Sequence, residues 1–584
     1  MTDTYEFNKS MESQTEDMYS PYSDKQQNNY VNDINSGVYT NNGLSLVQWD
    51  LSSIYNSSKF SDTGDLFAVL PITMVAGFSG APGTMVAPVA GNVNLLSIKN
   101  NFIHLIHQAD LTLNGKTVED AQAFINIAKH FQMLSEMSVN DLKTIGPTLG
   151  MYELDNWKSK VFNGSTTAFV TTKSGNGMTN NRPFNPQATY SAGDSTCCTA
   201  NQYDRIVNTG IQKRLGRYVD TTAGNVNGMF GTTAASIASL AQLNNDYTPN
   251  YQVLNTNYMV WYDYAVIKLS TLFDSLDKIG ITRKSDLFLR LYVNTGTLNA
   301  TISTPNGTTP GYSLTVANNS FNATCPFTIN YLNETSANGG IPAGVTNLTA
   351  GLYLAKPPNT SFNSINLASS QASHLMPACR IYYSQITIQP DIAESYILSN
   401  RAKKCIYRNV LTNQYNNIST GGNFNQIVSS GVVHPVGILI VPMVSSANLY
   451  ASNDFAFKSP FDTFPGDGHP LTLTNLQVTI GGTNILQSTL NYNFESFIEQ
   501  IIYAEQLTSA DFGVTVGLFD QAFWNNNRYY YINVERSNIT DKLQPRNINI
   551  SFTNNNLVAI DVLVFTIKSN QLTIDVETGL VSIP

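Results

Sequence analysis

Charged residues are scarce in this chain. Lysine, arginine, aspartate and glutamate make up 12% of its 584 residues, about half the usual share, and the net charge is −9. Binding to a nucleic-acid backbone needs clustered basic residues, and the densest basic group is the trio Arg401, Lys403 and Lys404. We interpret this trio as a solvated helix end. We therefore expect no direct, sequence-specific binding of nucleic acid.

Cysteine is also sparse. Cys197 and Cys198 are neighbours, and Cys325, Cys379 and Cys405 stand alone, so the pattern predicts neither a disulfide framework nor a zinc site. The first residues, beginning at Met1, lack the basic and apolar regions of a secretion signal. We expect a protein made and kept in a reducing cell interior, without secretion.

Long uninterrupted apolar runs are missing as well. The most apolar stretch, residues 66–93, is broken by three prolines and four glycines, so we expect no membrane span. Within it, residues 77–83 could form a membrane-active loop, but we favour a bent connection between strands.

Residues 1–44 contain almost no aliphatic side chains and are rich in polar and acidic ones. Such a composition buries too little apolar surface to offset the entropy of ordering. We expect a flexible N-terminal arm here, either disordered or loosely docked, with order starting at Leu46.

Most of the remaining chain alternates short apolar runs with turn residues. These runs are rich in valine, isoleucine, threonine and aromatic residues, which is typical of strands. We expect strands near residues 46–51, 66–70, 94–98, 102–113, 258–269, 287–293, 327–331, 380–388, 404–410, 436–441, 471–480, 528–534, 548–552, 558–567 and 571–576. Helices are expected after two hairpins described next, at 271–279 and at 393–401.

One short cassette occurs twice. Leu111 to Val118 and Leu476 to Leu486 each predict a strand, a tight glycine turn and a second strand, because Asn114-Gly115 and Gly481-Gly482 tolerate positive φ. Each copy continues into an apolar helix face that ends near an acidic residue. The shared order of elements suggests two related β domains.

Two long stretches interrupt this rhythm. Residues from 163 to about 250 show little aliphatic periodicity, and residues from 295 to about 378 are rich in threonine, asparagine, glycine and proline, with scattered strands. Excursions of this length inside a β domain are usually functional loops or small surface subdomains.

Several segments of the last third keep a fixed order along the chain: 379–391, 394–398, 430–442, 459–461, 493–500, 513–520, 533–546 and 560–565. Shorter segments of the first half belong with them, at 145–149, 272–277 and 289–294. Together these segments resemble the major capsid proteins of polinton-like viruses, virophages and related integrating elements.

This resemblance implies an all-β fold of two tandem, eight-stranded antiparallel jelly rolls with a few short helices. The first roll would occupy residues 45–390 with both insertions, and the second residues 391–584. It further implies a major capsid protein that assembles as pseudo-hexagonal homotrimers in the icosahedral shell of a tailless double-stranded DNA virus. Its partners would be neighbouring capsomers, penton proteins and minor capsid proteins. It would be synthesised inside the host cell and located in the virion.

Motifs with possible chemistry have simpler interpretations. His104 and His107 would share a helix face, but on the expected strand they point apart, which disfavours a metal site. Gly193-Asp-Ser195 lacks the preceding strand of a nucleophile turn, and Gly115-Lys-Thr117 lacks the upstream glycine of a phosphate loop. The other histidines, His130, His374, His434 and His469, are scattered. We expect no catalytic, cofactor-binding or metal-binding residue and no enzyme activity.

Two clusters near the C-terminus remain open. Glu535, Arg536, Asp541, Lys542 and Arg546 could form ion pairs between subunits or contacts within one turn. The run 529–531 consists of three tyrosines, which we expect to pack a sandwich rather than to bind a ligand.

Two other functions compete with a capsid role. Jelly rolls also serve as lectins, so a trimeric receptor- or carbohydrate-binding spike or fibre is the alternative. A β-rich glycoside hydrolase would need paired carboxylates in a cleft, and the sequence offers no defensible pair.

Overall fold

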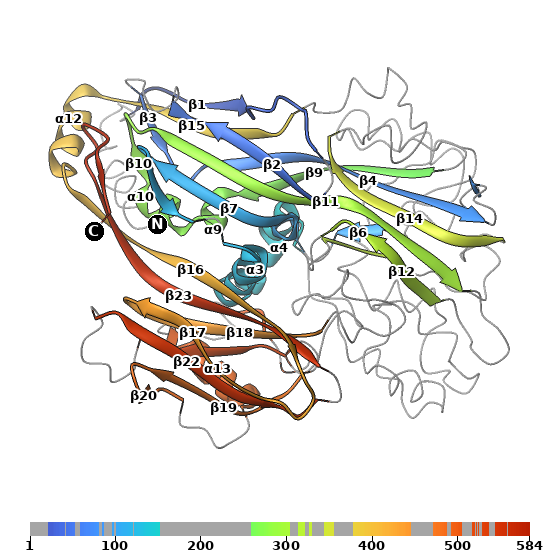
Figure 1. Cartoon of the computed structure of the whole chain (residues 1–584). Coiled ribbons are helices and arrows are strands. Elements are labelled where there is room, and N and C mark those ends of the chain that lie inside the picture. The colour runs from blue at the N-terminus through green and yellow to red at the C-terminus, as the bar shows by residue number, and fades with distance from the viewer. Residues whose placement is uncertain are drawn as a thin grey trace.

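Antiparallel strands dominate the part of the chain that the computed structural model describes (Figure 1). The described residues are 22–40, 43–52, 59–80, 85–86, 96–98, 101–120, 122–151, 258–303, 313–321, 326–329, 344–355, 378–445, 471–486, 492–504, 517–519, 521, 524, 528–535, 544–556 and 559–583. They form two sandwiches of strands, and in Figure 1 the N-terminal sandwich lies above the C-terminal one.

The C-terminal sandwich has the strand order of a jelly roll. Its strands are β16 (Lys403–Ile418), β17 (Asn423–Val432), β18 (Pro435–Val444), β19 (Leu473–Ile480), β20 (Thr483–Asn484), β21 (Tyr530–Asn533), β22 (Arg546–Asn554) and β23 (Ile560–Ile574). One sheet reads β16-β23-β18-β21 and the other β17-β22-β19-β20. Numbered along the chain, these orders are 1-8-3-6 and 2-7-4-5, which is the arrangement of two Greek keys in a jelly roll.

The N-terminal sandwich repeats the same order. Its eight positions are filled by β1 (Tyr22–Asn32), β2 (Gly43–Asp50), β4 (Phe67–Gly80), β7 (Ile106–Leu113), β8 (Lys116–Glu119), β9 (Tyr258–Lys268), β11 (Leu287–Ser303) and β15 (Arg380–Ile388). The pairings give β1-β15-β4-β9 in one sheet and β2-β11-β7-β8 in the other. The expected fold class, two tandem jelly rolls, is therefore present. We call the four sheets by their first strands: the β1, β2, β16 and β17 sheets.

Additional strands enlarge the first roll and extend the second. They are β3 (Phe60–Asp62), β5 (Met85–Val86), β6 (Leu96–Ile98), β10 (Ile281–Thr282), β12 (Ser313–Asn319), β13 (Phe327–Ile329), β14 (Val345–Leu354) and β24 (Val581–Ser582). β14 pairs with β4 on one side and with β11 on the other, so it joins the two sheets of the first roll. This strand lies inside the expected loop insertion of residues 295–378, and its last five residues are buried.

Helices are short and lie at the connections. They are η2 (Phe102–Leu105), α3 (Ile125–Glu136), α4 (Val139–Thr144), η3 (Gly146–Leu149), α9 (Leu269–Leu272), α10 (Asp274–Ile279), α12 (Pro390–Ser399) and α13 (Phe494–Ala504). α4 begins with a capping box, in which the Ser138 hydroxyl accepts from the backbone N–H of Asp141 and the Asp141 carboxylate accepts in return. α3 lies between the two rolls (Figure 1).

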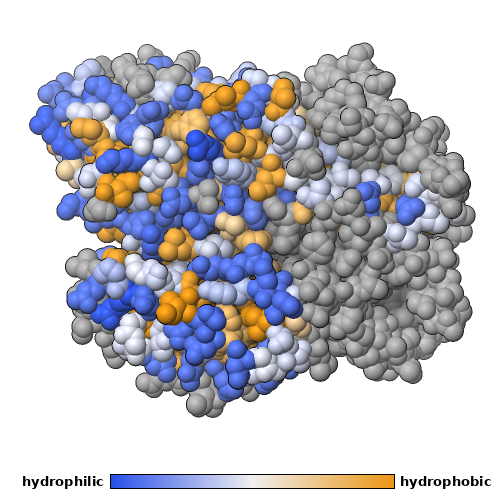
Figure 2. Space-filling view, in the orientation of Figure 1, coloured by the Kyte–Doolittle hydropathy of each residue, from blue (hydrophilic) through white to orange (hydrophobic). Residues whose placement is uncertain are grey.

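Alternation of side chains explains which strands have one buried face. In β2, Val47 and Trp49 are fully buried, and Gln48 between them is partly exposed. In β18, by contrast, the four consecutive residues 438–441 are completely buried, so both faces of this strand are covered. Where the viewed surface belongs to described residues, it mixes hydrophilic and hydrophobic side chains without one large apolar area (Figure 2).

The two glycine turns occupy corresponding places in the two rolls. Asn114 and Gly115 have φ values of 49° and 73°, and Gly481 and Gly482 have φ values of 56° and 84°. Each pair closes the hairpin between the fourth and fifth strands, β7–β8 and β19–β20. A helix follows each hairpin, α3 in one roll and α13 in the other. The structure thus confirms the duplicated cassette as an element of two repeated rolls.

The expected arm differs from the structure. Residues 22–32 form β1, which pairs with β15 from Tyr22 to Asn32, so order begins well before Leu46. The polar composition is compatible with this strand because its pairing uses backbone groups, which need no apolar side chains. Residues 1–21 lie outside the described part.

Three strand boundaries were also wrong. Residues 102–105 form the helical turn η2, and the strand starts only at Ile106. Residues 77–80, expected in a bent connection, extend β4 to Gly80. The two expected strands at 558–567 and 571–576 are one strand, β23.

Candidate functional site: the junction between the two rolls

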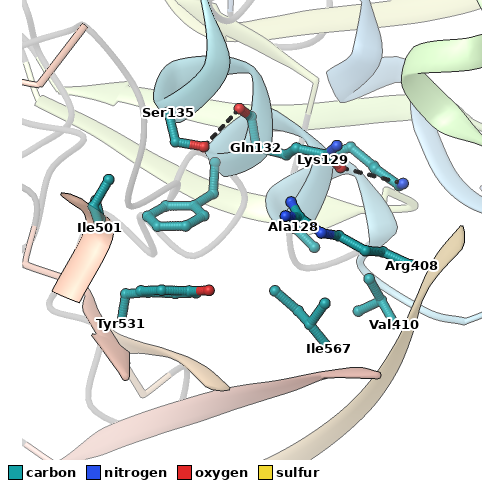
Figure 3. A pocket seen from close by; sticks show the side chains of 10 residues that line it. Ala128, Lys129, Gln132, Ser135, Arg408, Val410, Ile501, Tyr531 and Ile567 are labelled. Carbon is teal, nitrogen blue, oxygen red and sulfur yellow. Dashed lines mark hydrogen bonds between the residues drawn. The ribbon is translucent and has the colours of Figure 1, made fainter. Parts of the chain in front are cut away.

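The two rolls meet along one side of each. From the first roll come β8, α3 and α10, and from the second the outer face of the β16 sheet (Figure 1). The facing side chains are shown in Figure 3, where α3 lies above the strands of the second roll.

Aromatic packing forms the apolar part of this junction. Phe131 of α3 lies among rings of the second roll, with centroid distances of 5.5 Å to Phe519, 5.8 Å to Tyr529 and 5.5 Å to Tyr531. Phe131 is 4% exposed. Full burial of such a side chain is worth about 1.5–3 kcal/mol, with a further contribution from ring geometry. The tyrosines at 529–531 are buried: Tyr530 packs inside the sandwich, where its hydroxyl donates to the Leu471 carbonyl, and Tyr529 and Tyr531 face the first roll.

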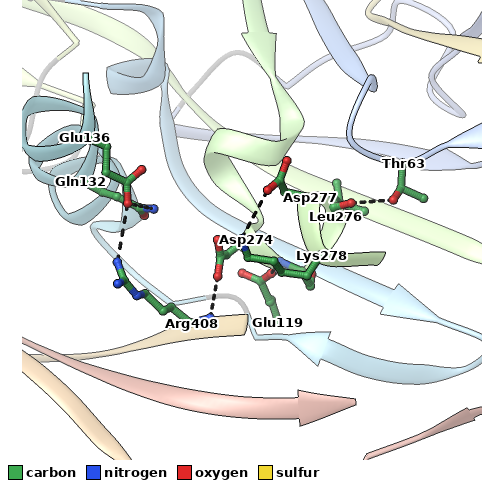
Figure 4. A network of polar contacts seen from close by, with 10 residues as sticks. Thr63, Glu119, Gln132, Glu136, Asp274, Leu276, Asp277, Lys278 and Arg408 are labelled. Carbon is green, nitrogen blue, oxygen red and sulfur yellow. Dashed lines mark hydrogen bonds and ion pairs between the residues drawn. The ribbon is translucent and has the colours of Figure 1, made fainter. Parts of the chain in front are cut away.

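Hydrogen bonds between the rolls use main-chain groups on at least one side. The Tyr407 hydroxyl donates to the Val118 carbonyl at 2.9 Å, and Lys403 Nζ donates to the Ile279 carbonyl at 2.7 Å. The Arg408 backbone N–H donates to Asp274 Oδ2 at 2.7 Å (Figure 4). Such bonds fix the register of β16 against the first roll, because each donor has one acceptor position. Lys403, expected in a solvated basic trio, is 7% exposed.

One ion pair links the rolls at the rim. Arg408 Nη1 lies 3.6 Å from Glu136 Oε1, and the two side chains are 38% and 42% exposed (Figure 4). Gln132 also donates to this carboxylate, at 2.9 Å. An ion pair with this exposure contributes about 0–1 kcal/mol, so the buried contacts hold the junction.

Glu119 is the most perturbed carboxyl group at the junction. It accepts hydrogen bonds from the Ser275 backbone N–H at 2.9 Å and from the Ser275 hydroxyl at 2.5 Å. Burial raises the pKa of Glu119 to about 7, and the nearby Lys129 and the Ser275 bonds oppose that rise. A carboxyl group in this position is a polar anchor between β8 and α10.

A small cavity remains beside Phe131. Its volume is about 40 Å³, and its walls come from α3, from the β16 sheet and from Ile501 of α13 (Figure 3). This space can hold one or a few waters, whereas ligand pockets are usually about 300–1,000 Å³. The junction is thus built for packing, with room for little else.

The C-terminal end of the chain forms a second link. α12 packs Ile397 against Phe60, Ile281, Ile386 and Ile388 of the first roll and Val576 near the C-terminus. The Asn114 side-chain amide donates to the Gly579 carbonyl, and Asn114 Oδ1 accepts from the Asp286 backbone N–H. The Asn114-Gly115 turn of the first cassette therefore contacts the second roll's C-terminal segment through Asn114.

The histidines lie in a different arrangement from the expected one. His104 Nε2 is 3.0 Å from His130 Nδ1, and the Asn101 amide is 3.1 Å from the same Nδ1. Sequence reasoning considered His104 with His107 and missed His130, because the partner lies on a helix 26 residues away. Within the described residues, no group of three or more histidine, cysteine or acidic side chains is placed to hold a metal ion.

The remaining motifs have the following places. Gly115-Lys-Thr117 belongs to the β7–β8 hairpin, as expected. Gly193-Asp-Ser195, Cys197, Cys198, Cys325, His374 and His469 lie outside the described residues, as do Arg536, Asp541 and Lys542 of the charge cluster. Cys379 and Cys405 are buried free thiols. None of the described helices is long and apolar enough to cross a membrane.

Comparison with known proteins gives similarity at the level of structure. No protein-family model and no curated protein matches the chain. Over 95% of its length, the chain is similar to 88% of a chain in the cryo-EM structure of the Sputnik virophage, with 12% identity and a TM-score of 0.44. The match to the mavirus major capsid protein covers 95% of this chain and 90% of the mavirus chain, with 9% identity and a TM-score of 0.43. The match to the Faustovirus major capsid protein covers 95% of this chain and 91% of the Faustovirus chain, with 9% identity and a TM-score of 0.43.

Proposed function

We propose that this chain is a major capsid protein, with a structural role and no enzymatic one. The observation that carries the proposal is the tandem pair of jelly rolls, with equal strand order, held together by a buried junction. A building block needs two fixed rolls rather than an active site, since its function is to repeat the same contacts. The sequence resemblance of the last third supports the same role.

The proposed assembly is a homotrimer in which three chains present six rolls. Such a capsomer fills a site with six neighbours in an icosahedral shell. Contacts of an obligate trimer typically bury more than about 2,000 Å², while contacts between capsomers can be smaller because repetition supplies avidity. Penton and minor capsid proteins would be further partners, the virion shell the location and the host cell the place of synthesis.

We also propose a division of the chain into two rolls, in which β1 is added to the first roll. We place the first roll at residues 45–390, extended by β1, and the second at residues 391–584. α12 then forms the connection between them.

Electron microscopy and mass measurement of the purified protein test the proposal. The expected particle has three times the 64.0 kDa mass of the chain and a pseudo-hexagonal outline, and it forms shells or sheets at high concentration. Elongated single trimers that bind a glycan array would instead support the spike or fibre alternative. A monomer at all concentrations would contradict both.

Salt provides a second test of the assembly. The chain is poor in charge, so contacts between capsomers should consist largely of uncharged polar groups, which salt screens little. Capsomer association should therefore change little between low and high salt. A steep loss of association at high salt would contradict this part of the proposal.

A further inference from the structure

The junction inside the chain also shows how two chains could meet. In this junction, β8 and α3 of the first roll, which we call its helix side, cover the outer face of the β16 sheet of the second roll. Because both rolls have the same strand order, the second roll also has a helix side, and the first roll also has a sheet equivalent to the β16 sheet. The second helix side is β20 with α13, and the second receiving sheet is the β1 sheet. In Figure 1, β1 lies at the top of the molecule, and β20 and α13 belong to the lower roll.

α13 has a face that corresponds to the docking face of α3. The two cassettes align so that Phe497 matches Ile127 and Ile501 matches Phe131, and all four side chains are buried. Three of the α3 residues that line the junction cavity, Ala128, Lys129 and Gln132, then match Ile498, Glu499 and Ile502 of α13. These three α13 side chains and Glu495 are partly or largely exposed. They lie on the helix next to Phe497 and Ile501, which already pack at the junction with α3.

The β1 sheet has an aromatic surface where the β16 sheet is covered. Tyr30 on β1, Tyr382 on β15 and Phe67 on β4 form a row of rings, with centroid distances of 5.8 Å and 5.1 Å along it. Tyr30 is 52% and Phe67 37% exposed. On β4, the exposed surface in this row is confined to Phe67, because β4 is buried from Ala68 to Phe78. Exposed aromatic rings next to a strand edge are typical of a protein–protein interface.

The charges of the two faces are complementary. The guanidinium of Arg380 lies 4.4 Å from the centroid of the Tyr30 ring, and Lys268 is exposed on the strand beside Phe67. The α13 face carries Glu495 and Glu499. Opposite charges on facing surfaces favour the correct partner and orientation.

We propose that α13 of one chain docks onto the aromatic row of Tyr30, Phe67 and Tyr382 in a second copy, and that this head-to-tail contact closes the trimer. The inference rests on the proposed capsid function and assigns its subunit contact. Such a contact is heterologous, because each chain uses two different faces, and a closed ring forms when the rotation between copies returns to the start.

The test uses one variant for each face. Tyr30→Glu damages the receiving surface, and Ile498→Glu damages the docking helix. Each should weaken trimer formation about tenfold or more, since a charge is placed in the centre of an apolar contact. Leu580→Glu, at a residue that is 70% exposed elsewhere, is the matched control and should leave trimers unchanged. Thermal unfolding of each monomer shows that it folds, and Glu495→Arg is a second docking variant at an exposed position.

Mixing the two damaged proteins gives the sharper result. One chain then keeps an intact docking face and the other an intact receiving surface, so the mixture should form a 1:1 dimer that cannot grow further. Native mass spectrometry measures this directly. Trimers that persist in both single variants, or a mixture that stays monomeric, would overturn the inference. If the wild-type chain itself forms no trimer, the proposed function fails instead.

Discussion

Asn114 and Gly579 are 465 residues apart, yet the side-chain amide of Asn114 donates a hydrogen bond to the Gly579 carbonyl. The first residue belongs to the glycine turn of the first roll, and the second follows β23 of the second roll. This bond joins a hairpin of one jelly roll to the C-terminal turn of the other. Val576, three residues before Gly579, packs in one cluster with Ile397 of α12, so the two links between the rolls are close together in the chain's C-terminal segment.

Replacement of Gly579 should therefore destabilise the protein more than an ordinary turn glycine. Its φ is +75°, and an added Cβ would collide with the Lys284 carbonyl oxygen. Gly421 has a similar φ of +73° but no atom within 4 Å of the added Cβ, which makes it a matched control. We expect Gly421→Ala to cost about 1 kcal/mol from backbone strain and Gly579→Ala about 1–3 kcal/mol more. Denaturant unfolding measures both, and equal losses would contradict the close approach.

Truncation of Phe131 should loosen the two rolls. Phe131→Ala removes a buried ring that contacts Phe519, Tyr529 and Tyr531, and such changes cost about 3–5 kcal/mol. Phe131→Leu keeps much of the volume and should cost less than half as much. Calorimetry should show one unfolding transition in the wild type and two separated transitions in Phe131→Ala. A single transition at an unchanged temperature would show that α3 does not couple the rolls.

Glu119 predicts a loss of stability as the pH rises towards neutrality. Its pKa is about 7 in the folded chain and 4.5 in the unfolded one, so the unfolded state releases its proton first. The stability contributed by the neutral acid is complete below pH 4.5 and is lost between pH 4.5 and 7. The difference corresponds to about 3 kcal/mol above pH 7.

The variant Glu119→Gln replaces the titratable carboxyl group by an amide, whose oxygen can still accept the hydrogen bonds from Ser275. It should be more stable than the wild type at pH 8 and nearly equal to it at pH 4. Glu394→Gln, at an exposed position of α12, is the control and should change neither value. Unfolding free energies at the two pH values decide the matter; a constant difference between wild type and Glu119→Gln would contradict the buried acid.

The lowered pKa of His107 predicts that stability falls as the pH falls, which is opposite to the effect of Glu119. Burial lowers its pKa from 6.5 to about 4, and its Nδ1 has no hydrogen-bond partner within the described residues. The unfolded chain therefore binds the proton first as the pH falls, and stability is lost between pH 6.5 and 4, by about 3 kcal/mol in full. His107→Leu should unfold at a lower pH than the wild type in an acid titration followed by circular dichroism. An unchanged acid midpoint would show that His107 does not contribute.

Local patterns were sufficient for much of the fold. The strand at Arg380–Ile388 and the two glycine hairpins follow from alternation and turn chemistry, because these depend on residues close together in the chain. The apolar faces of α3 and α13 were predicted for the same reason. β1 could not be predicted, because its polar residues pair with a strand about 350 residues later through backbone bonds.

By itself, the sequence determined the β class, the repeated cassette and the turns that need positive φ, since each is encoded within a few neighbouring residues. Only the tertiary structure decided that Phe131 packs against Tyr531, that His104 meets His130 and that Asn114 meets Gly579. These contacts join residues from 26 to 465 positions apart. Their choice depends on how two complete sandwiches pack against each other, which no local period records.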